Sequence, residues 1–256
     1  MIQGFSRIRR VLCKVGPQGK NAFLAGLRTA LRVGRGGLLV TANPETLAHA
    51  QEEAYLRILE DQRTRICADG VGLLKMARAA GLSIQERIPG VDCMSGLLAM
   101  AADESWDVAL LGARAVVLQE LLRRLARTYP ALRIVQAFDG YGPDKDEAMR
   151  AICAAEPRLL FVALGIPQQE ILIHRYLDQL PHCLCVGVGG SFDVLSGCKK
   201  RAPLVFQRTG TEWLYRLLVE PGRLKRFITN NLLFYLRWKR ACRQWKREEA
   251  AIGPET

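Results

Sequence analysis

The stretch Arg158–Gly190, RLLFVALGIPQQEILIHRYLDQLPHCLCVGVGG, contains the pattern that decides the fold. It opens with the apolar run RLLFVALG, continues through a helix-like segment from Pro167 to Leu180, and closes with a second apolar run, CLCVGVGG. Two short apolar runs separated by a segment of helical length predict a strand, a crossover helix and a parallel strand. Neither run alternates with polar residues, which is typical of strands that helices cover on both faces of a sheet.

The same alternation extends towards the N-terminus. Further strands are expected at Leu38–Thr41, Arg65–Cys67, Trp106–Ala113 and Leu132–Phe138. Helices are expected after them, first with Asn43 as N-cap and Pro44 in the first turn, then over Val71–Ala80, Val91–Ala102 and Leu118–Tyr129, and from Asp144 up to Pro157. This alternation predicts an α/β fold with a parallel sheet flanked by helices.

Ligands of such sheets bind beyond the carboxyl ends of the strands, where the strand order changes direction. The polar and glycine residues that follow the expected strands are therefore candidates for a site: Thr41, Asn43, Asp69, Gly112, Gly140, Tyr141, Gly165, Gln169, Gly189 and Asp193. Each has a plainer alternative. An Asp-Gly pair such as Asp69–Gly70 is typical of a turn, Asn43 and Asp193 could act only as helix caps, and Gln169 could be merely solvated.

The positive charge of the chain is concentrated in its last quarter. The 256 residues have a net charge of +12, and residues 199–247 hold 14 of the 37 Lys and Arg residues but only two acids, Glu212 and Glu220. The rest of the chain is therefore neutral, and the asymmetry indicates an anionic partner for the tail: a membrane surface, nucleic acid or phosphate groups. We expect an α/β core over residues 1–198, with parts 1–68 and 69–198, and a basic appendage over 199–256.

Two helices are expected in this appendage, over Val205–Val219 and Gly222–Lys246. In the second, large apolar residues recur along one stripe: Leu224, Phe227, Ile228, Tyr235, Trp238, Cys242 and Trp245. A basic helix with an aromatic stripe is typical of a membrane interface. The same periodicity also fits a helix that packs on the core and exposes a basic face, so both interpretations stay open.

Several classes of function lack their signatures here. The chain has no G-x-G-x-x-G, no G-x-x-x-x-G-K-[ST] and no G-x-S-x-G, and its three histidines are too scattered for a triad or a metal site. The D-x-D sequence at Asp144–Asp146 stands at a helix start, where capping is the ordinary role, so no metal and no other cofactor is expected. No apolar run approaches the ~18–20 residues that span a bilayer, and no signal peptide is expected.

Six motifs occur in an order that is far more specific than any one of them. They are TANPE, ADGVGLL, ERIPGVD, GIPQQE, GVGGSFDVLSGCKKRAP and TEWLYRLLVEPGRLKR. Together they resemble the WecG/TagA/CpsF family of bacterial glycosyltransferases, over about Leu38 to Arg226. The resemblance implies a Rossmann-like core, and the basic region of residues 223–247 is similar to the family's C-terminal appendage.

This resemblance implies an inverting, metal-independent transfer of a sugar, most often N-acetylmannosamine, from a UDP-sugar donor. The implied acceptor is N-acetylglucosamine linked through diphosphate to undecaprenol, in teichoic acid or other cell-surface polysaccharide synthesis. The implied place is cytoplasmic, peripheral on the inner face of the cell membrane, where the basic tail meets an anionic surface. An aromatic stripe on the tail also favours self-association in solution.

Three alternatives compete with this function. One is transfer of another hexose from its UDP-sugar in exopolysaccharide synthesis. A second is a nucleic-acid-binding module that uses the basic tail, against which the neutral core and the apolar residues interleaved in the tail count. A third is a Rossmann oxidoreductase, against which the missing glycine fingerprint counts.

The resemblance also implies roles for individual residues. The family's proposed catalytic base matches Asp69, and an inverting transfer needs such a carboxylate to deprotonate the attacking hydroxyl. Other family motif residues match Thr41, Arg87 and Gln169, and the appendage arginines that close over the diphosphates match Arg216, Arg223 and Arg226. The chain departs from the family at Ala68, where proline is usual, and at Gln168, where lysine is usual.

The remaining candidates follow from the chemistry of the substrates. Arginine side chains suit the negative charge that develops on a leaving diphosphate. Thr41, Asn43 and Gln169 would orient sugar hydroxyls or phosphate through neutral hydrogen bonds. Asp193 would accept a hydrogen bond from the uridine ribose, and Tyr141 is retained because it follows an expected strand.

Overall fold

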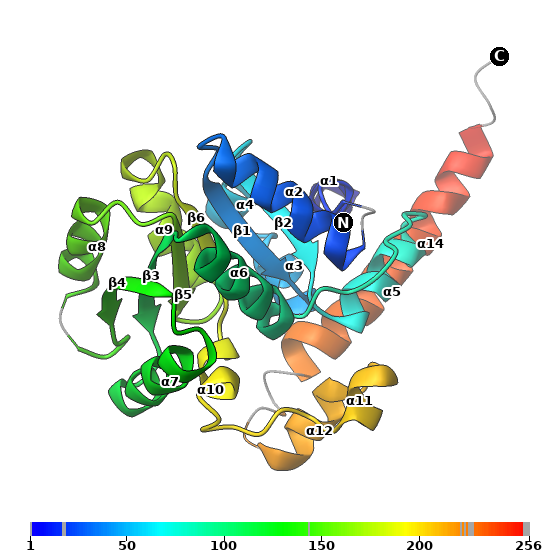
Figure 1. The fold of residues 1–256 in the computed structure, drawn as a ribbon. Coiled ribbons are helices and arrows are strands. Elements are labelled where there is room, and N and C mark those ends of the chain that lie inside the picture. The colour runs from blue at the N-terminus through cyan, green and yellow to red at the C-terminus, as the bar shows by residue number, and fades with distance from the viewer. Residues whose placement is uncertain are drawn as a thin grey trace.

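A six-stranded parallel sheet forms the middle layer of the protein (Figure 1). The computed structural model describes residues 2–16, 19–142, 144–220, 222, 224 and 228–252; of residues 2–5, 216, 230, 246 and 249–252 only the backbone is described. The strands are β1 (Gly37–Ala42), β2 (Thr64–Ala68), β3 (Asp107–Gly112), β4 (Arg133–Phe138), β5 (Leu159–Ala163) and β6 (Leu184–Gly187). They lie in the order β2-β1-β6-β5-β3-β4, and every neighbouring pair is parallel. The predicted α/β class is confirmed.

Helices cover both faces of the sheet. They are α1 (Ile2–Cys13), α2 (Lys20–Arg32), α3 (Pro44–His49), α4 (Glu53–Glu60), α5 (Val71–Ala79), α6 (Gly90–Glu104), α7 (Ala115–Thr128), α8 (Lys145–Ala154), α9 (Gln168–Tyr176), the short η1 (Leu177–Gln179), and α10 (Ser191–Leu195). Successive strand residues pack into two separate cores: Leu160 and Val162 of β5 face one, while Leu159 and Phe161 face the other. Because both faces are buried, the strands read as continuous apolar runs.

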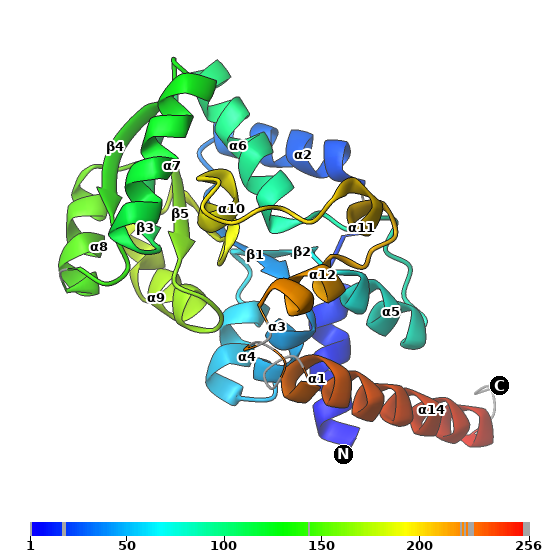
Figure 2. The same cartoon turned by 90° about the horizontal axis from the view of Figure 1, so that it is seen from below.

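The last fifty residues differ from the sequence prediction. In place of one helix over Val205–Val219, the chain forms α11 (Leu204–Arg208) and α12 (Glu212–Val219). Gly210, between them, has a φ of +70°, a left-handed conformation that ends α11 and that glycine adopts without steric cost. Figure 2 shows this segment passing the ends of β1 and β2. A π-helical turn, η3 (Ile228–Leu233), then leads into α14 (Phe234–Ile252).

The aromatic stripe of α14 packs on the core instead of facing solvent. Phe234, Trp238 and Cys242 are 7%, 3% and 2% exposed, and all three belong to the core that includes α1, α4 and α5. The indole Nε1 of Trp238 donates to the carbonyl of Met76 on α5 at 3.0 Å, and Arg9 lies over the ring of Trp245. Trp238 and Cys242 of the predicted stripe therefore face the core, as the core-packing alternative predicts, whereas Leu224 and Ile228 of the same stripe are 49% and 37% exposed.

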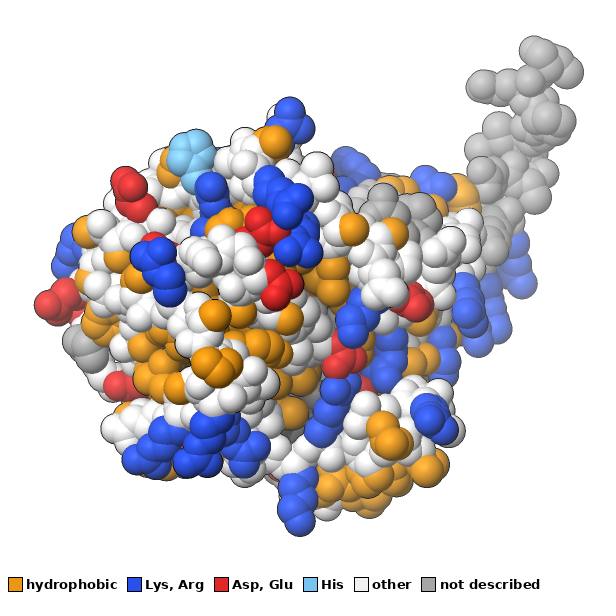
Figure 3. Space-filling view, in the orientation of Figure 1, with side chains coloured by type: hydrophobic (Ala, Val, Ile, Leu, Met, Phe, Trp, Pro, Cys, Tyr) orange, Lys and Arg blue, Asp and Glu red, His pale blue; other side chains and the backbone are white. Residues whose placement is uncertain are grey.

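The basic side chains of α14 lie on its other side. Arg237, Lys239, Arg240 and Arg243 are exposed. A second exposed group lies on α11 and α12, where Leu204, Val205, Leu218 and Val219 are each at least 60% exposed; apolar side chains gather at the lower right of Figure 3, over this part of the chain. Within the described ranges, every helix is too short or too polar to cross a bilayer. The division into a core and an appendage at residue 199 stays a prediction.

Candidate functional site

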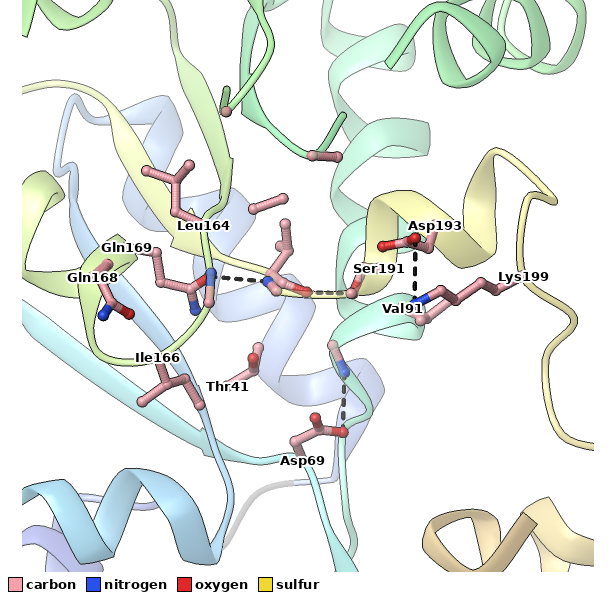
Figure 4. Close-up of a pocket in the computed structure, with 18 of the residues that line it drawn as sticks. Thr41, Asp69, Val91, Leu164, Ile166, Gln168, Gln169, Ser191, Asp193 and Lys199 are labelled. Atoms are coloured by element: carbon pink, nitrogen blue, oxygen red, sulfur yellow. Dashed lines mark hydrogen bonds and ion pairs between the residues drawn. The ribbon is translucent and has the colours of Figure 1, made fainter. Parts of the chain in front are cut away.

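A cleft of about 790 Å³ opens beyond the carboxyl ends of the strands (Figure 4). All six strands contribute to it through the residues that follow them, as the switch in strand order predicts. Its lining includes nine of the ten candidates that follow the expected strands, all except Gly112: Thr41, Asn43, Asp69, Gly140, Tyr141, Gly165, Gln169, Gly189 and Asp193. Segments that are more than 150 residues apart in sequence are thus brought to one place by the parallel topology.

Asp69 follows β2 directly and is held at both its backbone and its side chain. Its backbone N–H donates to the carbonyl of Ala42 at 2.8 Å, which extends the β1–β2 pairing by one residue. Its Oδ1 accepts from the backbone N–H of Gly90 at 3.2 Å, at the first residue of the 15-residue helix α6. The partial positive charge at the start of a helix favours the ionised carboxylate. Asp69 is therefore a fixed carboxylate on the wall of the cleft.

Thr41 and Asn43 both line the cleft while making local bonds. Thr41, 8% exposed, donates from Oγ1 to the carbonyl of Gly187 at 3.1 Å and so joins the ends of β1 and β6. Asn43 is the N-cap of α3, because its Oδ1 accepts from the backbone N–H groups of Glu45 and Thr46 at 2.8 and 3.2 Å. The predicted capping role is confirmed. The carboxamide nitrogen of Asn43 is left for other partners.

The side chain of Gln169 links two loops of the cleft, at Gly165 and Gly189, through hydrogen bonds. Its Oε1 accepts from the backbone N–H groups of Gly165 at 3.2 Å and Gly189 at 3.0 Å. Its Nε2 donates to Oε1 of Glu170 at 2.7 Å. Gln169 is only 2% exposed, so the solvated alternative was wrong. We call this arrangement the Gln169 staple, and a Cβ atom at Gly187 would lie 2.6 Å from its Nε2 and 2.8 Å from Oε1 of Glu170.

Glu170 is a buried acid that the sequence reasoning missed. It is 1% exposed, and its carboxyl group lies beside the buried hydroxyl of Tyr55. Burial, assisted by the nearby charge of Glu45, raises the pKa of Glu170 from 4.5 to about 7. Glu170 is the last residue of the GIPQQE motif, so the motif singled it out. The sequence does not show, however, that its side chain points into the core.

Replacing Glu170 with glutamine is expected to change how stability depends on pH. Above pH 4.5 the unfolded chain ionises this group while the folded protein keeps the proton up to about pH 7. The folded state then binds more protons, so rising pH through this window costs the wild type up to about 3 kcal/mol. The measurement is urea unfolding across pH 4.5–8. The free energy of unfolding of Glu170→Gln minus that of the wild type should therefore increase between pH 4.5 and 7 and stay constant above pH 7. A difference that stays constant over the whole range would show that Glu170 ionises alike in the folded and unfolded protein. The control is Glu147→Gln, which replaces an exposed acid on α8 and for which no such increase is expected.

Tyr141 and Asp193 stand on the outer part of the cleft. Tyr141 is 80% exposed, and only its backbone N–H is fixed, by Oδ1 of Asp139 at 2.9 Å. Asp193 lies in the first turn of α10, whose N-cap is Gly190 and whose start has no side-chain cap, so the capping alternative for Asp193 was wrong. Its carboxylate instead pairs with Nζ of Lys199 at 3.6 Å (Figure 4).

The predicted arginines are not all brought to the cleft. Arg87 does not line it; its guanidinium binds the carboxylate of Glu212 and donates to the carbonyl of Gln207 at 2.7 Å. Arg216 lies on α12, and its side chain is outside the description. Arg223 and Arg226 lie outside the described residues.

Four cations that the sequence reasoning did not select line the cleft: Arg114, Lys145, Lys199 and Arg201. The guanidinium of Arg201 donates to both oxygens of Asp92, at 2.7 and 2.9 Å. Burial opposes the ionisation of Asp92, but this bidentate pair outweighs it and holds the pKa of Asp92 below its usual value. Lys199 and Arg201 belong to the motif GVGGSFDVLSGCKKRAP, which was the signal that the sequence offered for them.

The D-x-D sequence has structural roles. Asp144 caps α8 by accepting from the backbone N–H of Asp146 at 3.1 Å, which confirms the capping prediction. Asp146 pairs with Arg175 at 3.0 Å and accepts from the hydroxyl of Tyr176. In the part of the chain that the structure describes, no three His, Cys, Asp or Glu side chains are grouped so that they could hold a metal ion.

The arrangement combines a fixed carboxylate with cations across one cleft. Asp69 can accept a proton from a bound hydroxyl, since carboxylates are general bases when they lie within hydrogen-bond reach. Lys199 and Arg201 can bind an anion such as a phosphate group. The cleft is of the size that encloses a small-molecule ligand.

Comparisons with known proteins bear on the same residues. The sequence model of the family described as "Glycosyl transferase WecG/TagA/CpsF family" matches residues 12–250. An N-acetylglucosaminyldiphosphoundecaprenol N-acetyl-beta-D-mannosaminyltransferase of Bacillus spizizenii is 38% identical over 209 residues, which cover 81% of this chain and 81% of that protein. A protein of the same name from Bacillus subtilis is 36% identical over 195 residues, 76% of each. The family match includes every residue that lines the cleft.

Proposed function

The chain belongs to the WecG/TagA/CpsF family of glycosyl transferases, and from this premise we propose that it transfers N-acetylmannosamine from a UDP-sugar. The proposed acceptor is N-acetylglucosamine linked through diphosphate to undecaprenol. The names of both Bacillus relatives support this acceptor and this sugar. Transfer of another hexose from its UDP-sugar is the alternative.

The observation that carries the proposal is the position of Asp69. Its carboxylate stands on the wall of a cleft at the switch point of the sheet, fixed by the start of α6. In an inverting transfer, one carboxylate takes the proton from the acceptor hydroxyl as that hydroxyl attacks the anomeric carbon opposite the leaving UDP. Asp69 is the proposed base.

The leaving diphosphate needs positive charge, and cationic side chains are the proposed source. Lys199 and Arg201 line the cleft, and Arg87 lies next to it through Glu212. Arginine binds phosphate oxygens in a bidentate manner, and a preorganised cation stabilises charge that develops in the transition state. Arg216, Arg223 and Arg226 are proposed to close over the same diphosphates.

The neutral polar residues would position the donor. The second hydrogen of Gln169 Nε2, the carboxamide nitrogen of Asn43 and the lone pairs of Thr41 Oγ1 can bind sugar hydroxyls, because their hydrogen bonds to the described residues leave these groups unused. Asp193 and Tyr141 stand on the outer part, where a ribose and a uracil ring can reach them. Asp193 would accept from a ribose hydroxyl, and Tyr141 offers a ring for stacking.

A lipid-linked acceptor requires the protein to work at a bilayer surface. We propose peripheral attachment on the cytoplasmic face, through the basic side of α14 and the exposed apolar residues of α11 and α12. Lysine and arginine near an anionic surface contribute about 1 kcal/mol each, so the attachment would weaken with salt.

A transfer assay tests the proposed function. Purified protein is given a short-chain lipid-diphosphate-N-acetylglucosamine acceptor with UDP-N-acetylmannosamine, UDP-N-acetylglucosamine or UDP-glucose, in the presence of EDTA. We expect transfer from UDP-N-acetylmannosamine that EDTA does not reduce. Transfer from another of the donors alone would select the alternative, and loss of transfer with EDTA would contradict a cationic site without metal.

A further inference from the structure

The two acids of the basic tail both pair with cations at the cleft. Between residues 199 and 247 the chain has only Glu212 and Glu220, and they flank the helix α12 at its first residue and just after its last. Acids that only increase solubility would be expected to face water, whereas Glu212 and Glu220 form ion pairs with Arg87, Arg201 and Lys199. We therefore looked for a function of these ion pairs.

Glu212 lies between two guanidinium groups. Its Oε2 accepts from Arg87, and its Oε1 lies 3.8 Å from Nε of Arg201. The side chain of Glu212 is 12% exposed and that of Arg87 is 20% exposed, so this contact is partly withdrawn from water. One anion that bridges two arginines is the arrangement that a phosphate group would also adopt.

Glu220 makes the corresponding contact at the other end of α12. Its Oε1 lies 3.0 Å from Nζ of Lys199, whose other carboxylate neighbour is Asp193 at 3.6 Å. The helix α12 is thus held at both ends by ion pairs to residues of the cleft wall. At about 1.5 Å per residue, the two contacts are separated by about 12 Å along the helix.

The charges of this group decide what it can bind. Arg87, Lys199 and Arg201 supply three positive charges, which face the carboxylates of Asp92, Asp193, Glu212 and Glu220. Among the described residues, these carboxylates occupy all three cations, so a further anion has to displace one of them. If Glu212 and Glu220 withdraw, the donors of Arg87, Lys199 and Arg201 that they occupied become available to a diphosphate.

We propose that Arg87, Lys199 and Arg201 are a diphosphate-binding group, and that Glu212 and Glu220 are internal carboxylates which the diphosphate displaces from it. Binding of the diphosphate thereby breaks the ion pairs that Glu212 and Glu220 make with the cleft wall on either side of α12. The proposal rests on the proposed function for the source of the diphosphate, which is either the UDP-sugar or the lipid-linked acceptor. It gives the two acids of the tail, Glu212 and Glu220, a role in the binding of that diphosphate.

Calorimetric titration of the full-length protein tests the competition. Pyrophosphate, UDP and farnesyl diphosphate are titrated into the wild type, Glu212→Gln, Glu220→Gln and the control Glu248→Gln. The control removes the same charge from α14, at a residue whose Oε1 accepts from Nε2 of Gln244 on the same helix. We expect Glu212→Gln to bind pyrophosphate about 3- to 10-fold more tightly, because a partly exposed ion pair no longer competes. Glu248→Gln should stay within about twofold of the wild type. Equal affinities of Glu212→Gln and Glu248→Gln would overturn the proposal.

The other two ligands identify the source of the diphosphate. A larger gain for UDP assigns the group to the donor, a larger gain for farnesyl diphosphate assigns it to the acceptor, and either result supports the displacement. Arg201→Gln should weaken pyrophosphate binding at least about tenfold, since a bidentate cation is lost. Unchanged binding by Arg201→Gln would overturn its assignment.

Hydrogen exchange on the wild type keeps the test independent of variant folding. Saturating pyrophosphate should raise the exchange rates of the α12 amides, residues 212–219, and leave those of α6 unchanged. Unaltered exchange in α12 would overturn the displacement. These measurements need no transfer, so the two proposals fail separately: a protein that transfers no sugar can still show the competition, and an active enzyme can lack it.

Discussion

Replacement of Asp69 by asparagine is expected to lower the rate of sugar transfer by about 10²–10⁴-fold, the range that a general base contributes. Asparagine keeps the size of the side chain and its oxygen can still accept from the N–H of Gly90, so the start of α6 should stay in place. What is lost is the basic oxygen that takes the proton of the attacking hydroxyl. The measurement is kcat with the lipid-linked acceptor at saturating donor.

Two controls separate catalysis from binding and folding. UDP should bind to Asp69→Asn with nearly the affinity of the wild type, because the carboxylate is not expected to contact the nucleotide. Asp103→Asn, which changes an exposed acid on α6, should transfer at the wild-type rate. If Asp69→Asn retained full activity, Asp69 would be a turn residue only, and the base would have to be sought at another strand end.

Replacement of Trp238 by alanine is expected to destabilise the fold by about 3–5 kcal/mol, the cost of removing a large buried aromatic side chain. The indole is 3% exposed between α14 and α5, and its loss leaves a cavity at the contact through which α14 is held. The measurement is the free energy of unfolding from urea titration. A loss below about 1 kcal/mol would contradict the packing of α14 on the core.

Trp238→Phe is the matched variant. It keeps an aromatic ring in place but removes the Nε1 donor to the Met76 carbonyl, which also accepts from the N–H of Ala80. Because that carbonyl keeps a partner, the loss should be about 1 kcal/mol. The difference between the two variants then measures how much of the docking of α14 is due to apolar burial.

The sheet was predictable because its strands are buried on both faces. Such strands appear in a sequence as uninterrupted apolar runs, and the caps and glycines between them mark where each helix begins or ends. The N-cap at Asn43 and the clustering of Thr41, Asp69 and Gln169 at one end of the sheet followed from the topology alone. The strand order did not, because it depends on which apolar faces meet.

The rest of the site depends on partners that are distant in sequence. The periodicity of α14 is the same whether its stripe faces a bilayer or a core, and only the packing of Trp238 decides between them. Likewise, Gln169 and Glu170 are neighbours in sequence, yet Gln169 bonds to two loops of the cleft while the side chain of Glu170 is buried in the core. The bond between Arg87 and Glu212 joins residues 125 positions apart, which no local pattern signals.

The Gln169 staple has a consequence for anyone who wishes to evolve this enzyme towards new donors. Gly187 never needs to touch a sugar, yet any side chain there would collide with the staple and open the two turns that it closes. A randomised library should therefore keep glycine at position 187. Diversity belongs at Gln168, which lines the cleft, is exposed and can vary without disturbing the hydrogen bonds of the staple.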